Sequence, residues 1–498
     1  MAHETISQNR RNAAEALVNM LHRPKNILVF GNVVDAVPSP NDKAGLKDVL
    51  PNLGSRMAYP ASELANACPD IQVYTYIGGC ITPGEVDFLK KLNLQGNNHL
   101  MAVVEGELVD LSARKPEEIK KDFESTPSQE DILRLSRLHG EQIPPSERAL
   151  LPFISVPTSE YYPSGDAVVG PNTSLVALKH VMASRIREKQ QQGQIQEKMV
   201  ARGIVLEKEI VQAILENRYN PQEINALFDE LGGTLVLKGT DGVSGLSVGF
   251  LKQGDFVQDS INLQRLLHKI LAEGDGVRIT EVLVDEKVDI EVDSLGDRKF
   301  NVRSIIDSDG VIIPYAVFRQ LENGVKFAGE ISAFEPRDLG LTPEQYQKLL
   351  KTHVEWAKTA HELGYSGPFS TDILGATDGS YVGVDPNPRY GGSSALAVVQ
   401  EWYYATHTDK RSHLLLDREL KITHADGSPL SFEEICSLDD SLRDLGLIPY
   451  ATGLMKNSAM KLIIPATREQ VEHDNLTSHE GFTAYVNALI GAEGIKIS

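Results

Sequence analysis

The segment TDILGATDGSYVGVDPNPRYGG, residues 371–392, places two aspartates, an asparagine and an arginine around one tight turn. Asp378-Gly379 is a strong hairpin signal, because a two-residue type I′ turn requires positive φ angles that this dipeptide tolerates. With these two residues as the turn, Asp372 and Asp385 stand directly opposite each other, with their Cβ atoms roughly 5 Å apart. We therefore predict two carboxylates on one face of a β-hairpin.

The same face of this hairpin carries further polar side chains. Because side chains alternate along a strand, Asn387 and Arg389 project to the same side as Asp385, while Pro386 and Pro388 point away. Two carboxylates this close repel each other unless they take up a proton or hold a cation between them. Hard oxygen ligands of this kind suit Mg²⁺ or Mn²⁺, and the arginine suits a phosphate. The hairpin taken alone leaves a second interpretation open, in which it is solvated and its charges point into water.

The composition is that of a multidomain globular protein. The chain has 498 residues, which suggests two to four domains, and its 41% hydrophobic and 24% charged residues are ordinary values. No stretch approaches eighteen consecutive apolar residues, and the first residues lack the apolar core of a signal peptide. We therefore expect a cytoplasmic protein without a membrane partner. The net charge of −20 argues against a nucleic-acid partner.

The three cysteines, Cys68, Cys80 and Cys436, share no metal-ligand spacing. We expect them to be small core residues, because neither a disulfide framework nor a zinc site is indicated.

Short apolar runs alternate with helical segments in the first third of the chain. Each run is long enough for a buried strand and precedes turn residues, which is the pattern of a parallel α/β sheet. We predict a Rossmann-like domain over residues 1–167, with strands near Asn26, Ile71, His99 and Pro152. No GxGxxG follows the first strand, so the sequence does not indicate a dinucleotide there.

A mixed α+β region follows over residues 168–402, and a smaller α/β extension over residues 403–498 completes the chain. Within the central region a capping box predicts a helix over residues 343–363. His353 and His361 lie on that helix, and we interpret them as packing or surface residues rather than ligands.

The segment TLVLKGTDGVSGLSVGF, residues 234–250, reads as a strand that ends in Lys238 and leads into a glycine-rich loop. An ammonium followed by unobstructed backbone N–H groups can grip a polyphosphate. The lysine precedes the glycines, so this is not a Walker loop. The alternative is a mobile hairpin tip with no ligand.

The third informative segment is ITEVLVDEKVD, which begins at Ile279. Here Glu281 to Val284 suit an adenine edge, and Asp289 lies within reach of ribose hydroxyls. The alternation of polar and apolar residues is also what any half-buried strand shows.

In this order, a lysine with a glycine loop, an acidic hinge, and paired acids with N-x-R, the chain resembles the ATP-grasp superfamily over roughly Val168 to Ser394. Within it, FRQ at Phe318, NGVKFAGE at Asn323, SGPFSTDI at Ser366 and DPNPRYGGSS at Asp385 look most similar to pheganomycin-type peptide ligases. The resemblance implies an α/β and α+β multidomain fold, in which a Rossmann-like pre-ATP-grasp domain precedes an ATP-grasp fold. It also implies ATP and Mg²⁺, or Mn²⁺, as cofactors.

The resemblance also implies roles for individual residues. Two would be catalytic: Lys238, which would contact the ATP phosphates, and Arg389, which would meet the γ-phosphate and the acyl phosphate. The residues that would bind the nucleotide are Lys238, the lid residues Gly242, Ser244, Gly245 and Ser247, and then Glu281, Val284 and Asp289. The metal ligands would be Asp372, Asp385 and Asn387.

The chain departs from the family pattern at several positions. Asp385 stands where most relatives have a glutamate, one methylene longer, which leaves open whether one or two metal ions are held. The earlier phosphate lysine of the family has no unambiguous counterpart, and Lys179 is a candidate. Arg303 and Arg319 suit further phosphate or substrate contacts, and surface salt bridges explain them equally well.

The function implied is an ATP-dependent carboxylate–amine ligase that forms an amide or peptide bond through an acyl phosphate and releases ADP and phosphate. Its substrates would be amino acids or small peptides, with backbone N–H groups near Gly391 and Gly392 as oxyanion contacts. Two alternatives stay open: another ATP-grasp activity, such as a carboxylate–thiol ligase, a carboxylase or a phosphotransferase, and a catalytically silent nucleotide-binding regulatory protein. A homodimer is the default expectation for the assembly.

Overall fold

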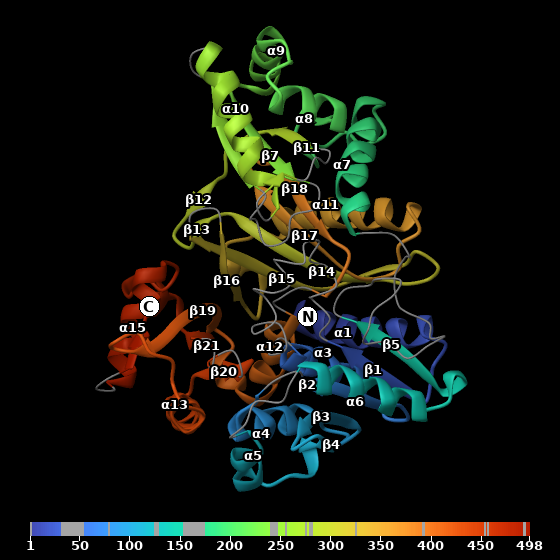
Figure 1. Cartoon of the computed structure of the whole chain (residues 1–498), viewed down its shortest axis with the longest axis vertical. Helices are drawn as coiled ribbons and strands as arrows, with labels where there is room; N and C mark the ends of the chain where they lie inside the picture. Colours follow the sequence, from blue (N-terminus) through green and yellow to red (C-terminus); the bar gives the residue numbers. More distant parts are fainter. Residues whose placement is uncertain are drawn as a thin grey trace.

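The computed structural model describes residues 2–30, 54–77, 80–123, 129–152, 175–239, 248–253, 256–273, 276–277, 282–323, 326–390, 394–452, 455, 458–491 and 495–498. Figure 1 shows three tiers along the long axis: the N-terminal domain at the bottom, a large sheet in the middle and a smaller lobe at the top. The C-terminal elements lie beside the lower two tiers.

The N-terminal domain is built on a five-stranded sheet of order β4-β3-β2-β1-β5, parallel except for β4. Its strands are β1 (Asn26–Phe30), β2 (Gln72–Ile77), β3 (Asn98–Val104), β4 (Glu107–Asp110) and β5 (Arg148–Pro152). Its helices are α1 (Ala2–Met20), α3 (Gly54–Ala67), α4 (Pro83–Leu92), α5 (Pro116–Asp122) and α6 (Gln129–Gln142). The parallel sheet and its first three strands confirm the sequence-based prediction. The fourth strand, β5 (RALLP), pairs with β1 and begins earlier in the chain than predicted, and the predicted segment after Pro152 lies outside the described residues.

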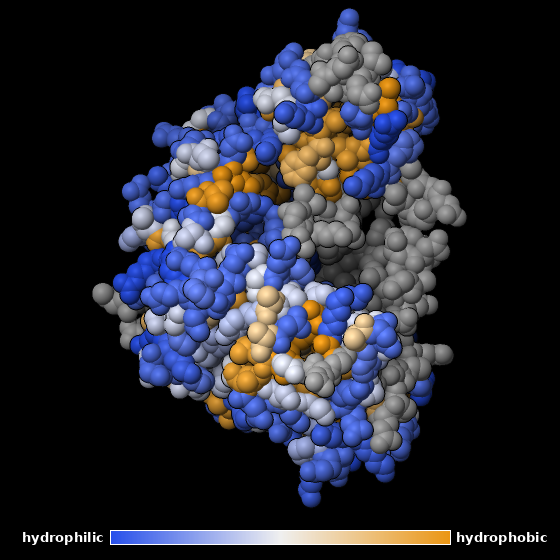
Figure 2. Space-filling view, turned by 90° about the vertical axis from the view of Figure 1, so that its left-hand side faces the viewer, coloured by the Kyte–Doolittle hydropathy of each residue, from blue (hydrophilic) through white to orange (hydrophobic). Residues whose placement is uncertain are grey.

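The upper lobe, residues 203–286 where described, is a four-stranded antiparallel sheet of order β6-β11-β7-β8 with helices on one face. Its elements are β6 (Gly203–Leu206), α8 (Lys208–Leu215), α9 (Pro221–Leu231), β7 (Thr234–Gly239), β8 (Val248–Lys252), α10 (Phe256–Ile270) and β11 (Val282–Glu286). The short strands β9 (Ala272–Glu273) and β10 (Gly276–Val277) pair with each other. The lobe has an apolar core of its own between the sheet and its helices. Apolar surface gathers on this lobe in Figure 2, and Phe250 and Ile261 are the exposed large apolar residues within its described part.

The middle tier is a nine-stranded sheet in which each described pairing is antiparallel. Along the sheet the order is β18-β17-β14-β15-β16-β19-β21-β20, with β22 paired to β19. The strands are β14 (Lys299–Ile306), β15 (Ile312–Asn323), β16 (Lys326–Ser332), β17 (Gly367–Gly375), β18 (Tyr381–Asn387), β19 (Leu414–His424), β20 (Ile448–Tyr450), β21 (Ala459–Ala466) and β22 (Ile495–Ile497). Because β19 pairs with β16, the C-terminal extension continues the sheet of the central region. The domain boundaries at 167 and 402 stay predictions.

Helices cover the large sheet at several places. They are α7 (Leu175–Gln191), α11 (Pro343–Glu362), α12 (Ser394–Thr406), α13 (Phe432–Asp444), α14 (Arg468–His473) and α15 (His479–Ile490). The short strands β12 (Val292–Asp293) and β13 (Gly296–Asp297) pair with each other and lie between β11 and β14 in the chain. The predicted capping box of α11 is present, since Thr342 Oγ1 accepts from Gln345 N. His353 on α11 is fully buried and contacts Ser304 Oγ at 2.9 Å, and burial lowers its pKa to about 3, so its packing role is confirmed. The three cysteines are buried core residues, as predicted, and none of them forms a disulfide bond.

The β17–β18 hairpin differs from the prediction at its turn. Ala376 N donates to Ser380 O, and Gly379 N donates to Ala376 O, so the loop is a three-residue one that spans Thr377, Asp378 and Gly379. Only Gly379 of these has a positive φ, of 80°, and the predicted type I′ turn is therefore wrong. The Asp378 carboxylate caps the loop by accepting from Ser380 N at 2.9 Å.

A β-bulge in β18 restores the predicted pairing. The longer loop sets a register in which Gly375 faces Tyr381 and Ile373 faces Gly383. The register then shifts by one residue at Val384, so that Asp372 faces Asp385. The loop and the bulge displace the register in opposite directions, and for this reason the carboxylate pair stands where the sequence placed it.

One buried carboxylate fastens the N-terminal domain to the C-terminal extension. Glu85 on α4 accepts hydrogen bonds from Ala451 N, Thr452 N and Thr452 Oγ1, each at 2.7 Å, in the segment after β20. The N-terminal domain and the large sheet also share one apolar core, which includes Tyr59 and Phe318. The lower two tiers are thus joined by both apolar burial and a satisfied buried acid. Among the described residues, no helix has the length and apolar character needed to cross a lipid bilayer.

Replacing Glu85 by alanine should loosen this junction. The change leaves the N–H groups of Ala451 and Thr452 buried without a partner, at about 1–3 kcal/mol for each group. We expect the free energy of unfolding to fall by about 2–4 kcal/mol, measured as a shift of the urea midpoint. Glu107→Ala, at an exposed position of β4, is the control and should stay within about 0.5 kcal/mol. Equal effects of the two changes would contradict this assignment.

Candidate active site

The carboxylate pair forms the centre of the site. Asp372 on β17 and Asp385 on β18 are directly opposite in the ladder, and Asn301 Nδ2 on β14 donates to Asp372 Oδ1 at 2.6 Å. Removal from water and the charge of Asp385 raise the pKa of Asp372 to about 6. Asp385 keeps 44% of its side-chain surface accessible, so an ion or nucleotide can reach the pair.

Lys179 on α7 supplies a counter-charge. Its Nζ lies 2.7 Å from Asp385 Oδ1. Burial opposes ionisation of Asp385, but the charges of Lys179, Lys238 and Arg389 outweigh it, and the pKa of Asp385 is lowered. The structure thus brings into the site the lysine that the sequence marked only as a candidate.

Asn387 and Arg389 continue the polar face beyond the acids. Asn387 Nδ2 donates to Asp385 Oδ2 at 3.2 Å, and Arg389 Nη2 donates to Asn387 Oδ1 at 3.1 Å. Burial lowers the pKa of Arg389, and the charges of Asp385 and Asp372 oppose that effect. The four polar residues predicted to share one face of the hairpin are therefore linked in a chain of contacts.

Lys238, at the end of β7, reaches this hairpin from the upper lobe. Its Nζ donates to Asp285 Oδ2 at 2.9 Å and to the carbonyl oxygen of Val384 at 3.2 Å. Val384 is the residue at which the register of β18 shifts. The bulge therefore provides the carbonyl that the lysine contacts.

The remaining nucleotide-binding predictions fall partly outside the described residues, as Gly242, Ser244, Gly245, Ser247 and Glu281 do. Val284 is described and is buried in the core of the upper lobe, on the face that packs against the helices. Asp289 is exposed, and its carbonyl oxygen accepts from Thr377 N in the loop of the hairpin. The structure thus places neither side chain beside the carboxylate pair, and the roles of these residues stay predictions.

Two apolar residues lie on the same face of the upper-lobe sheet as Lys238 and were not predicted from the sequence as site residues. Leu283 pairs with Lys238, and Val236 lies two residues before that lysine on β7, so period-two alternation puts all three on the side away from the helices. Each of the two apolar side chains is 8% exposed. The alternation of side chains along VLVDE was the signal in the sequence that could have identified Leu283. It places Leu283 and Val284 on opposite faces of the strand, so the face that packs against the helices decides which of the two lies beside Lys238.

The two arginines singled out in the sequence are both buried, so their interpretation as surface salt bridges is wrong. Arg319 is fully buried and pairs with Asp293 and the carbonyl oxygens of Gly296 and Leu339, which makes it a structural residue. Arg303 is 2% exposed and donates to Ser394 Oγ at 2.8 Å. Its positive charge acts on Arg389 and contributes to lowering the pKa of that group, so Arg303 belongs to the site region.

The oxygen atoms at the pair suit a hard divalent cation. Among the described residues, no three His, Cys, Asp or Glu side chains are grouped so that they could hold a metal, so the two acids need other oxygen ligands. Asn301 Oδ1 is buried beside Asp372 and has no hydrogen-bond partner among the described residues. Carboxylate and amide oxygens are ligands that Mg²⁺ binds, and water completes its coordination.

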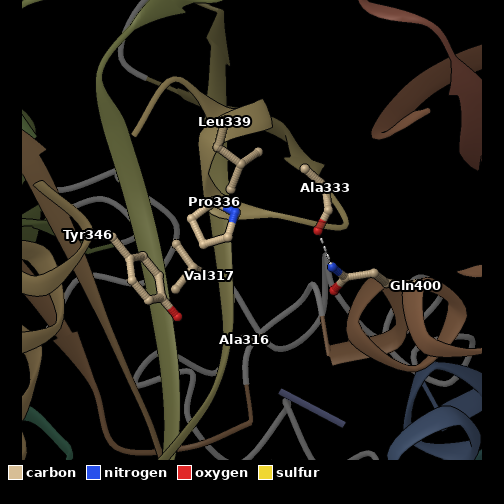
Figure 3. A pocket seen from close by; sticks show the side chains of 7 residues that line it. All are labelled: Ala316, Val317, Ala333, Pro336, Leu339, Tyr346 and Gln400. Atoms are coloured by element: carbon tan, nitrogen blue, oxygen red, sulfur yellow. Dashed lines mark hydrogen bonds between the residues drawn. The ribbon is translucent and has the colours of Figure 1, made fainter. Parts of the chain in front are cut away.

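A small cavity lies away from these residues. It is lined by Ala316, Val317, Ala333, Pro336, Leu339, Tyr346 and Gln400. Gln400 Nε2 donates to the carbonyl oxygen of Ala333 at 2.6 Å, and Figure 3 shows this contact beside the ring and hydroxyl of Tyr346 and the apolar side chains of the wall. None of the lining side chains is charged, and so this cavity offers no chemistry comparable to that of the carboxylate pair.

Comparison with known proteins gives the fold. No family model and no curated protein matches the chain. Among solved structures, the chain is similar to a biotin carboxylase–ATP analogue complex from Campylobacter jejuni, with a TM-score of 0.50 and 11% identity over 95% of this chain and 93% of that one. It also matches an N5-carboxyaminoimidazole synthase from Aspergillus clavatus (TM-score 0.44, 10% identity, 94% and 99% covered) and a phosphoribosylamine–glycine ligase from Thermotoga maritima (0.43, 14%, 95% and 97%).

The likeness to the biotin carboxylase confirms the predicted fold class. The chain has a Rossmann-like N-terminal domain followed by an ATP-grasp fold. At 11% identity the likeness bears on the fold alone, and the reaction has to be argued from the site.

Metal binding at this site should weaken in mild acid. Protonation of Asp372, whose pKa is about 6, removes a charge that a divalent cation needs. We expect Mg²⁺ affinity to be complete above pH 7 and to fall by about tenfold per pH unit below pH 6, measured by Mg²⁺ titration calorimetry. Asp372→Asn should abolish this dependence together with most of the affinity. A flat affinity between pH 5 and pH 7 in the unchanged protein would contradict the assignment.

Proposed function

We propose that the protein is an ATP-dependent carboxylate–amine ligase that forms an amide or peptide bond through an acyl phosphate and releases ADP and phosphate. We further propose that it acts on amino acids or small peptides, in the manner of the pheganomycin-type ligases that it resembles. The observation that carries this proposal is the convergence of Lys179, Lys238 and Arg389 on the Asp372–Asp385 pair from different elements.

Each part of the cofactor has a set of residues suited to it. Asp372, Asp385 and Asn387 would hold Mg²⁺, and the free amide oxygen of Asn301 adds a further ligand. Lys238 and Lys179 would contact the phosphates of ATP, with the segment Gly242 to Ser247 above them. When bound, MgATP supplies the phosphoryl group that turns a carboxylate oxygen into a leaving group. Leu283 and Val236 offer an apolar surface beside Lys238 that suits the adenine ring.

Arg389 and Arg303 are the residues that would orient the substrate carboxylate. Arg389 is held by Asn387 and by the carbonyl oxygen of Tyr390, so its guanidinium direction is fixed. Arg303 lies nearby, and its buried Nε atom has no hydrogen-bond partner in the part of the chain that the structure describes. Two guanidinium groups in a partly buried site can hold an anionic oxygen and stabilise the negative charge that develops during transfer.

The amine step needs no nucleophilic residue. The amine nitrogen would attack the activated acyl carbon, the C–O bond to phosphate would break, and the departing phosphate would take up the proton that the nitrogen loses. Arg389 would stabilise the negative charge on the oxygen during this step. Closure of the upper lobe over the site would exclude water, which otherwise hydrolyses an acyl phosphate. A protein that only binds a nucleotide has no need of the whole acidic face, and this speaks against the regulatory alternative.

The reaction itself can be tested with purified protein and MgATP against amino acids and small peptides, singly and in pairs. We expect ADP release to require one carboxylate and one amine and to yield a condensed product detected by mass spectrometry. Asp385→Asn should lower kcat by about 10²–10³-fold, because it removes one charge from the metal site. Asp378→Asn, in the loop of the same hairpin, should leave kcat within about twofold.

The other outcomes of this experiment are distinct. ADP release that requires a thiol or a phosphoryl acceptor would replace the ligase proposal by one of the other ATP-grasp activities. MgATP binding without turnover on any pool would favour the regulatory protein, and no MgATP binding would overturn the assignment of the hairpin.

Lys179 should serve the nucleotide rather than the protein's stability. Lys179→Met removes one charged contact to the phosphates, so we expect the KM for ATP to rise by about tenfold or more while the melting temperature changes little. Lys189→Met on the same helix, whose lysine pairs with Glu355 and Glu362, is the matched control. A larger effect of Lys189→Met on KM would contradict this role.

A further inference from the structure

One buried carboxylate joins the upper lobe to helix α7. Asp285 on β11 is 4% exposed; its Oδ2 accepts from Lys238 Nζ at 2.9 Å, and its Oδ1 pairs with Arg187 Nη2. Arg187 lies on α7, which packs against α11 on the large sheet through Met182 and Ile186. Asp285 is therefore held from the side of the large sheet while it holds Lys238 of the lobe.

Residue 203 on β6 is a glycine, and its lack of a side chain leaves space for the Asp285 carboxylate. Gly203 on β6 is paired with Asp285, and a Cβ atom at position 203 would lie 2.4 Å from Asp285 Oδ1 and 2.9 Å from Arg187 Nη2. Any side chain there would displace the ion pair. The glycine is thus explained by the close approach of Asp285 and Arg187 together with the backbone carbonyl oxygen of Val284, which would also lie 2.4 Å from the Cβ atom.

Lys238 is constrained from two sides. An ammonium has three N–H donors, and Asp285 Oδ2 and the Val384 carbonyl oxygen accept two of them. One donor then remains for a ligand, in a direction that the other two fix. The group of Arg187, Asp285 and Lys238 carries two positive charges and one negative charge. Its net charge of +1 keeps it attractive to a phosphate.

We propose that Asp285 is a positioning residue for Lys238: it holds the ammonium against the β18 bulge, so that the lysine meets the nucleotide phosphates already in place. A free lysine side chain must lose its rotamer freedom when it binds, and pre-orientation removes that loss. The ion pair of Asp285 and Lys238 is a feature of the protein without any ligand, whereas its benefit to phosphate binding rests on the proposed function.

The first test measures the ion pair without any nucleotide. Acetylation of lysine amines by a short pulse of an N-hydroxysuccinimide ester, read by peptide mass spectrometry, reports how freely each ammonium can react. In Asp285→Asn we expect Lys238 labelling to rise at least about threefold, because the amide no longer holds the charged ammonium. Glu286→Gln is the matched control, since the neighbouring Glu286 is equally buried but pairs with Lys198 and Arg202.

The second test measures MgATP affinity by titration calorimetry on the same variants. We expect the Kd of Asp285→Asn to rise by about three- to tenfold, and that of Glu286→Gln to stay within about twofold. Arg187→Gln keeps the carboxylate but removes its second partner, so an intermediate rise is expected. Asp285→Glu retains the charge and should recover part of the affinity.

The outcomes separate the two proposals. Unchanged Lys238 labelling in Asp285→Asn would overturn the ion pair and the inference with it. Increased labelling with an unchanged Kd would show that Asp285 does not position the lysine for the nucleotide, which also overturns the inference. If Asp285→Asn increases Lys238 labelling but the protein without substitutions binds no MgATP, the proposed function is refuted and the ion pair stands.

Discussion

Asp372 and Asp385 are held face to face by the hydrogen bonds of the β17–β18 ladder, and their mutual repulsion shapes the surrounding site. The strand pairing fixes a distance that two free carboxylates would avoid, and the pKa of Asp372 rises to about 6 through removal from water and this neighbouring charge. The amide of Asn301 and the ammonium of Lys179 each lie against one member of the pair. These groups compensate the repulsion only in part, and a divalent cation can supply the rest.

The residues that compensate the repulsion between the two carboxylates come from separate parts of the chain. Lys179 belongs to α7, Asn301 to β14 and Lys238 to β7, so the site exists only when these elements are assembled on the hairpin. A cation between the carboxylates would compete with Lys179 for Asp385. Lys179 would then be released toward the phosphates that accompany the cation. Under the proposed function, Lys179 would thus occupy the place of the metal charge in the protein alone, and its contact with Asp385 is compatible with a later contact to phosphate.

The carboxylate pair can be predicted because the residues that determine it lie close together in the sequence. Contacts between residues far apart in the sequence cannot be predicted in this way. The pair Asp372–Asp385 was predicted through a wrong turn type, since the three-residue loop and the bulge at Val384 shift the register in opposite directions. The Rossmann-like sheet and α11 follow from periodicity and a capping box. Asn301 and Asp285 contact their partners across strands far apart in the chain, and a single sequence holds no signal for such pairs. The buried state of Arg319 depends on the same long-range packing.

The way the parts are attached indicates which of them moves. The N-terminal domain shares an extensive apolar core with the large sheet and is further fixed by Glu85, so separating them would expose much apolar surface. The core of the upper lobe consists of the lobe's own residues, whereas α7 packs with α11. The lobe contacts the rest through polar pairs such as Arg187–Asp285 and Lys238–Val384, while Ala201 and Val288 at its two ends pack in a small apolar cluster with Ala376 and Val382. Polar contacts can exchange with water at little net cost, while buried apolar surface cannot. Rotation of the upper lobe about its flanking segments is therefore easier than separation of the lower two tiers, and it would break or remake the contact of Lys238 with Val384 beside the Asp372–Asp385 pair.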